Sequence, residues 1–216
     1  MKFFTRHPME ILMKYPILYY VYDPMCSWCW GYRNTWLQLS QMMDKKMLIQ
    51  YQLGGLASDT DIEMPIELQV SLQGIWRNIQ ARLGTEFNFD FWRLCTPQRS
   101  TYPACRACLI AREEGKEKEM LFAIQQAYYL HAKNPSLKET LVELAANIGL
   151  NVDEFEAKLT ANEINKKLEQ EIGSSRQLPI QGFPSLVLEV EGKYLPIQID
   201  YLDWQKTYYQ IMSYLN

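Results

Sequence analysis

Short runs of apolar residues predict strands near the two ends of the chain. Four such runs occur, at residues 17–22, 48–53, 185–190 and 193–197. The first two are rich in β-branched and aromatic residues, and they end at the strand breakers Asp23-Pro24 and Gly54-Gly55. The last two flank the turn dipeptide Glu191-Gly192 and therefore predict a hairpin. Pro196 lies in the returning strand and favours a place at the sheet edge.

Helical spacing of apolar residues fills the rest of the chain. Trp36, Leu39 and Met43 predict a helix after the first strand. A long block from about residue 64 to 172 repeats this spacing, with expected helices over 68–83, 101–115, 120–128, 134–149 and 153–173. Residues 201–215 predict a closing helix.

The order of these elements indicates the fold class. The chain runs β-α-β, helical block, β-hairpin and α. Without the block, this is an α/β thioredoxin fold, so the sequence predicts a thioredoxin fold with a large helical insertion between its β-α-β and β-β-α halves. We expect residues 15–60 and 174–216 to form the thioredoxin-like domain and residues 61–173 the inserted helical domain.

A Cys-Ser-Trp-Cys tetrapeptide, Cys26 to Cys29, follows the first strand and its turn and opens the first helix. This context is typical of a redox dithiol. Cys26 would lie near unpaired backbone N–H groups and the positive end of the helix dipole, which favour its thiolate. The alternatives are two structural cysteines, or half of a zinc site completed by Cys105 and Cys108. The zinc alternative is disfavoured because the two pairs lie much farther apart than the ~15–20 residues of compact zinc modules.

The second pair, Cys105 and Cys108, shares one face of an expected helix. The simpler interpretation is two small core residues, since free cysteine is often buried. The alternative is a second thiol pair that exchanges with the first. Asp23 has two interpretations as well: a proton acceptor, or, as we prefer, a capping or turn residue.

Composition narrows the function classes. The chain has 216 residues, 48% of them hydrophobic, with a net charge of −3 and a pI near 5.5. These values argue against a nucleic-acid surface, and no apolar stretch reaches membrane-spanning length. Residues 1–15 lack an apolar core and a small-residue cleavage site, so we expect a cytoplasmic protein. Disulfides in that compartment are usually transient and catalytic.

Three motifs together resemble a known family. Residues 23–31 (DPMCSWCWG), 102–107 (YPACRA) and 182–185 (GFPS) are closely similar to the FrnE group of DsbA-like predicted protein-disulfide isomerases. The resemblance implies a thiol–disulfide oxidoreductase with Cys26 as nucleophile and Cys29 as resolving thiol. It also implies that Pro184 is a cis residue that faces the dithiol and shapes the substrate groove. Periplasmic DsbA has Pro-His between its cysteines, where this chain has Ser27-Trp28.

The expected substrates are cysteine-containing proteins or peptides, with Met25, Trp28 and Phe183 as apolar binding surface. The cycle needs no prosthetic group, no metal and no membrane, but it does need a cellular thiol reductant or oxidant, for which glutathione is a candidate. A homodimer is left open. Two other classes remain as alternatives. Kappa-class glutathione transferases and 2-hydroxychromene-2-carboxylate isomerases share the topology but typically have serine where Cys26 stands, and a client-binding chaperone would use the groove without redox chemistry.

Overall fold

The computed structural model describes residues 15–215 and contains one four-stranded sheet. Its strands are β1 (Ile17–Tyr22), β2 (Leu48–Leu53), β3 (Ser185–Val190) and β4 (Lys193–Ile197), in the order β2-β1-β3-β4. β1 and β2 are parallel, with Ile17 opposite Leu48, and β3 is antiparallel to both β1 and β4. All four strands have the predicted bounds, and β4 with Pro196 lies at an edge.

Helices account for most of the remaining chain. The first is α1 (Ser27–Met43), and the last is α9 (Trp204–Ser213). Seven more lie between β2 and β3: α2 (Ile66–Leu83), α3 (Phe91–Leu94), α4 (Tyr102–Glu113), α5 (Glu117–Tyr129), α6 (Lys138–Asn147), α7 (Val152–Leu159) and α8 (Asn162–Ser175). The fold is therefore the predicted thioredoxin fold with a large helical insertion between its two halves.

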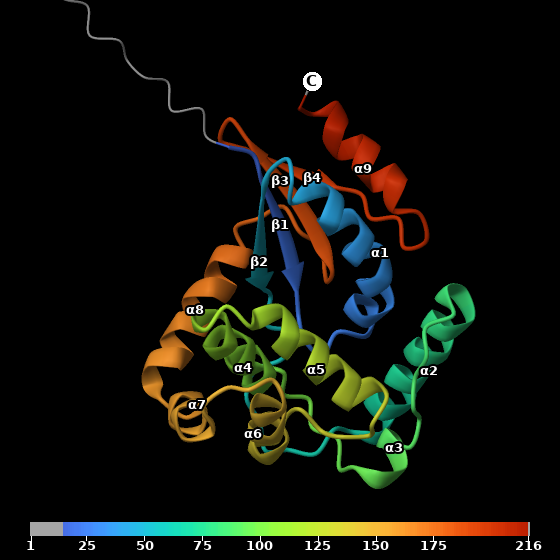
Figure 1. The fold of residues 1–216 in the computed structure, drawn as a ribbon. Coiled ribbons are helices and arrows are strands. Elements are labelled where there is room, and N and C mark those ends of the chain that lie inside the picture. The colour runs from blue at the N-terminus through green and yellow to red at the C-terminus, as the bar shows by residue number, and fades with distance from the viewer. Residues whose placement is uncertain (1–14, 216) are drawn as a thin grey trace, which may run out of the picture.

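The helices lie on the sides of the sheet and beyond one of its ends (Figure 1). α1 and α9 pack together beside the sheet, and α8 packs against β2. The helices α4 to α7 gather beyond the end of the sheet, and α2 lies to one side of them, where it contacts α1 and packs its Trp76 ring on Tyr128 and Tyr129 of α5. The insertion thus reaches the thioredoxin half through both α2 and α8, and the predicted domain division at residues 61 and 173 remains a prediction.

The aromatic residues of β1 connect the sheet to α1 and to the insertion. Tyr20 is buried and stacks on Trp36 of α1, with 4.3 Å between ring centroids. Tyr22 is also buried, and its hydroxyl donates to the Glu117 carboxylate in α5. Glu117 and Glu171 both pair with Arg112 of α4, so these ion pairs tie three inserted helices to the end of β1.

The helical predictions need correction at four points. The helix expected from Asn134 begins at Lys138. The expected helix over 153–173 is broken at Thr160 and Ala161, where Ala161 is extended (ψ 142°), so that α7 and α8 can each pack on α4. The short helix α3 was not predicted. The last helix begins at Trp204 rather than at Tyr201, because the Asp203 side chain accepts from the Gln205 N–H and starts it there. Within residues 15–215, no helix is long and apolar enough to cross a membrane.

Candidate active site

The two cysteines of the tetrapeptide occupy different environments at the start of α1. Cys26 is the N-cap residue, has extended backbone angles and is 8% exposed, whereas Cys29 is one turn into the helix and fully buried. Burial raises the pKa of the Cys29 thiol, and its hydrogen bond with Cys26 raises that pKa further. Cys26 is therefore the more exposed of the two thiols, as expected from its place at the start of the helix, although most of its surface is covered.

The loop before β3 lies against Cys26. The Cys26 thiol donates to the Phe183 carbonyl oxygen at 3.3 Å, and the Phe183–Pro184 peptide bond is cis, as predicted. The Phe183 ring rests on Gly54 at the end of β2, where an added Cβ would lie 1.9 Å from a ring carbon. The absence of a side chain at Gly54 therefore allows this ring, and with it the Phe183 carbonyl, to approach Cys26. The catalytic role of Pro184 stays a prediction.

A pocket of about 370 Å³ opens beside Cys26. The residues predicted to bind substrate, Met25, Trp28 and Phe183, all contribute to its wall. α2 supplies a further apolar stripe, formed by Leu68, Leu72 and Ile75. Arg99 is the one charged residue among those that line this pocket. The pocket thus offers mainly apolar contacts to a molecule whose sulfur is near Cys26.

Trp28, between the cysteines, is half-buried and held on two sides. Its ring makes an edge contact with Tyr201, at 5.2 Å between centroids, and the Arg82 guanidinium lies 5.6 Å from the ring centre. A cation over an indole is attracted by the negative face of the ring. Trp28 therefore forms a fixed wall of the pocket, and Tyr201 is a neighbour that the sequence did not indicate.

Asp23 is a fully buried carboxylate beneath the tetrapeptide. It accepts hydrogen bonds from the Met25 and Leu56 N–H groups, from the Thr101 hydroxyl and, at 3.6 Å, from the Cys105 thiol. Burial raises the pKa of Asp23, and the hydrogen bonds act against this shift. The side chain does not cap α1; the bond to Met25 is a turn contact, so the turn role is the one that the structure supports.

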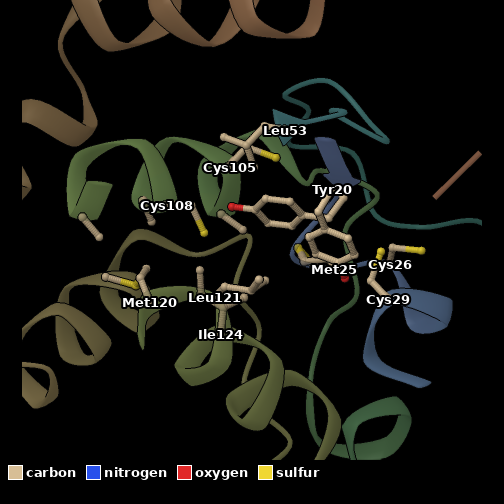
Figure 2. Packing of buried hydrophobic residues seen from close by; sticks show 14 of the residues in the cluster. Tyr20, Met25, Cys26, Cys29, Leu53, Cys105, Cys108, Met120, Leu121 and Ile124 are labelled. Carbon is tan, nitrogen blue, oxygen red and sulfur yellow. The ribbon is translucent and has the colours of Figure 1, made fainter. Parts of the chain in front are cut away.

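Cys105 and Cys108 are both fully buried in the core. Figure 2 shows them on α4, with Tyr20 and Met25 between them and the pair Cys26 and Cys29. Burial raises the pKa of both thiols, which disfavours the reactive thiolate. This environment agrees with the simpler interpretation of core residues, and redox activity of the pair stays untested. Among residues 15–215, no group of three or more His, Cys, Asp or Glu side chains could hold a metal ion.

Several contacts of the site join residues far apart in the chain. The Trp76 indole N–H donates to the Ser27 hydroxyl oxygen at 2.9 Å, and Thr101 donates to Asp23 at 2.7 Å. Neither Trp76 nor Thr101 belongs to a motif with a known spacing to the tetrapeptide. The one sequence feature that pointed to this part of the site was the nearby Tyr102-Pro103, which belongs to one of the three family motifs.

Comparison with known proteins agrees with this geometry. A sequence model of a thioredoxin family matches residues 19–194, so the chain belongs to that family. A Nitrosomonas europaea protein, described as a candidate protein disulfide isomerase, has the same fold with a TM-score of 0.82 and 25% identity; the match covers 94% of this chain and 98% of that one. The cytosolic disulfide reductase DsbM from Pseudomonas aeruginosa matches with a TM-score of 0.74 and 24% identity, over 92% of this chain and 98% of that one.

One curated relative has a different description. The ClpXP adapter protein SpxH from Halalkalibacterium halodurans is 22% identical over 188 residues. The match covers 84% of this chain but spans 59% of the length of that relative. Together, the family and the solved structures confirm the DsbA-like assignment and show that the chain has the fold of thiol–disulfide oxidoreductases.

Proposed function

We propose that this protein is a thiol–disulfide oxidoreductase that uses Cys26 and Cys29 as its redox dithiol. The observation that carries the proposal is the placement of the two sulfurs. Cys26 lines an apolar pocket, and Cys29 is buried directly behind it within hydrogen-bond contact. A nucleophile in front and a resolving thiol behind are what exchange through a mixed disulfide requires.

The reaction has two steps. The Cys26 thiolate attacks one sulfur of a substrate disulfide, the substrate S–S bond breaks, and one substrate thiolate leaves. Cys29 then loses its proton and attacks the Cys26 sulfur, which releases the second substrate thiolate and leaves a Cys26–Cys29 disulfide. The substrate gains two electrons and the protein loses two, so a thiol reductant must restore the dithiol. An isomerase would instead release Cys26 by attack of a thiol from the substrate itself.

The proposed substrates are cysteine-containing proteins or peptides that place apolar residues against Met25, Trp28 and Phe183. Two relatives support partners of this kind: DsbM from Pseudomonas aeruginosa was also solved with GSH, and a DsbA from Proteus mirabilis was solved with a non-covalently bound peptide. We propose glutathione as a reductant on this basis. A cytoplasmic location is proposed with it, because DsbM is a cytosolic reductase.

A binding role without redox chemistry is the second candidate. Apart from the pocket, α2 and the segment before it expose the apolar side chains of Ile62, Ile66 and Val70. Such a surface suits a client chain, and SpxH is described as an adapter protein. Glutathione transfer or isomerisation is less favoured, since it would leave the buried Cys29 without a role.

Trapping experiments separate these functions. We expect Cys29→Ser to accumulate mixed disulfides through Cys26, detected by mass spectrometry, because the resolving thiol is gone. Cys26→Ser should abolish exchange and trap nothing. Cys95→Ser is the control: this half-buried thiol donates to the Ala132 carbonyl, and its loss should leave exchange unchanged. Exchange that survives in both Cys26→Ser and Cys29→Ser would refute the redox proposal and favour the binding role.

A further inference from the structure

A side-chain hydrogen bond joins Ser27 of the tetrapeptide to the inserted helix α2. This residue lies between Cys26 and Cys29 and lines the same pocket. Its hydroxyl oxygen accepts a hydrogen bond of 2.9 Å from the indole N–H of Trp76, in the middle of α2. A residue 49 positions away therefore holds the side chain next to the nucleophile.

Trp76 is a rigid donor, because it lies at the centre of an aromatic cluster. Its side chain is fully buried. Six rings lie within 6.1 Å of it, measured between centroids: Phe87, Phe89, Phe91, Trp92, Tyr128 and Tyr129. Interiors packed in this way leave a large side chain little room to change its rotamer. The indole N–H consequently has a fixed position and fixes the acceptor side of the Ser27 hydroxyl.

Because the Ser27 hydroxyl oxygen accepts this hydrogen bond, the hydroxyl proton is directed toward a different acceptor. A hydroxyl that accepts one hydrogen bond becomes a better donor for another. Its neighbours are the sulfur of the preceding residue, Cys26, and the buried hydroxyl of Tyr129, with which the Ser27 side chain also interacts. Burial raises the pKa of Tyr129, interactions with Tyr128 and with the thiols of Cys26 and Cys29 add to that shift, and the hydrogen bond with Ser27 acts against it. Ser27 and Tyr129 are thus both neutral hydroxyls close to the place where thiolate charge develops.

We propose that Trp76 and Ser27 are positioning residues through which the inserted helices stabilise the reduced, thiolate form of the Cys26–Cys29 pair. The inference rests on the proposed redox function. A donor near a thiolate favours the charged state, and a more stable dithiol form makes the disulfide easier to reduce. Loss of the Trp76–Ser27 bond should therefore shift the pair toward its disulfide.

The test measures the equilibrium of the Cys26–Cys29 pair with glutathione buffers of varied ratio, using thiol alkylation and mass spectrometry. We expect Trp76→Phe and Ser27→Ala each to raise the disulfide fraction, by about threefold to tenfold in the equilibrium constant, as suits loss of one hydrogen bond. The double variant should shift no further than the larger single shift, because both changes remove the same bond.

Two controls separate this bond from general packing. Trp92 belongs to the same cluster, but its buried indole N–H has no partner among the described residues, so Trp92→Phe should leave the equilibrium unchanged. Ser27→Thr keeps a hydroxyl and should stay near the original value. The inference fails if Trp76→Phe and Trp92→Phe shift the equilibrium equally, or if Ser27→Ala and Ser27→Thr give the same value. The Ser27 comparison decides alone if Trp76→Phe does not fold.

Failure of the underlying redox function would look different. In that case the unaltered protein would not form a Cys26–Cys29 disulfide at any glutathione ratio. If the unaltered protein equilibrates and the variants match it, the redox proposal stands and the role of Trp76 is refuted.

Discussion

Replacing Gly54 by Ala should disturb the site from a position that carries no reactive group. A methyl group there would lie 1.9 Å and 2.1 Å from two carbons of the Phe183 ring, so the ring must move. Forcing extra volume into a packed contact usually costs about 1–3 kcal/mol. Because Phe183 is half-exposed and its ring can swing toward solvent, we expect a loss of unfolding free energy near the lower end of this range, about 1 kcal/mol.

The effect on exchange should be larger than the effect on stability. Movement of Phe183 displaces the carbonyl that accepts from the Cys26 thiol and alters the pocket wall, so we expect disulfide exchange to fall about tenfold, the change produced by misplacing roughly one strong contact. Urea unfolding and turnover of a model disulfide would be measured together. Gly74→Ala is the matched control, since no atom lies within 4 Å of its added Cβ, and mid-helix alanine should stabilise α2 by about 0.5–1 kcal/mol. In a Phe183→Ala background the ring that meets the methyl group is absent, so Gly54→Ala should cost little there; an equal cost in both backgrounds would refute the reasoning.

Three further predictions concern Asp23, the core pair Cys105 and Cys108, and the ion pairs of Arg112. Asp23→Asn should lower the free energy of unfolding by about 1–3 kcal/mol. The new amide N–H groups would face N–H and O–H donors whose hydrogen bonds the carboxylate accepts. Burial raises the folded-state pKa of Asp23, so its contribution to stability falls as pH rises from the unfolded pKa of 3.8 through the folded pKa. Urea unfolding of the unaltered protein and of Asp23→Asn at several pH values should show this fall only in the unaltered protein. Cys105→Ala with Cys108→Ala should lower stability by about 1–3 kcal/mol and leave exchange unchanged; loss of turnover in the folded variant would establish a second redox pair. Arg112→Ala should cost about 2–3 kcal/mol by urea unfolding, since it leaves two largely buried carboxylates unpaired, and an unchanged midpoint would contradict this account.

The strands could be predicted from the sequence because local signals alone define them. An apolar run such as 17–22 ends at Asp23-Pro24, and 48–53 ends at Gly54-Gly55; in each case the breaker fixes the strand end within the run itself. The break between α7 and α8 has no such signal. Neither Thr160 nor Ala161 is a strong helix breaker, and the only irregularity in the apolar pattern is the five-residue step from Leu159 to Ile164. Packing of both helices on α4 decides the break, and a periodicity argument does not contain that packing.

The site was predictable only where its residues share a motif. Cys26, Cys29 and Phe183-Pro184 were found because each belongs to a short pattern whose context could be checked. The partners that define their environment were missed, because their contacts depend on the tertiary fold. From the sequence alone, Trp76 is simply one more apolar residue of a helix, and Thr101 is simply the residue before another helix.

The convergence of these contacts indicates what the insertion contributes. The carboxylate of Asp23 needs donors because it is buried, and one of the strongest comes from Thr101 at the start of α4. The hydroxyl of Ser27 receives its donor from Trp76 in α2. Both donors belong to the inserted segment, whereas both acceptors belong to the strand-turn-helix unit that carries the cysteines. The thioredoxin half without these donors would hold a buried carboxylate and a redox dipeptide with incomplete hydrogen bonding, and such deficits cost about 1–3 kcal/mol each. If Cys26 and Cys29 act as proposed, the insertion is therefore part of the active site as well as a wall of its pocket.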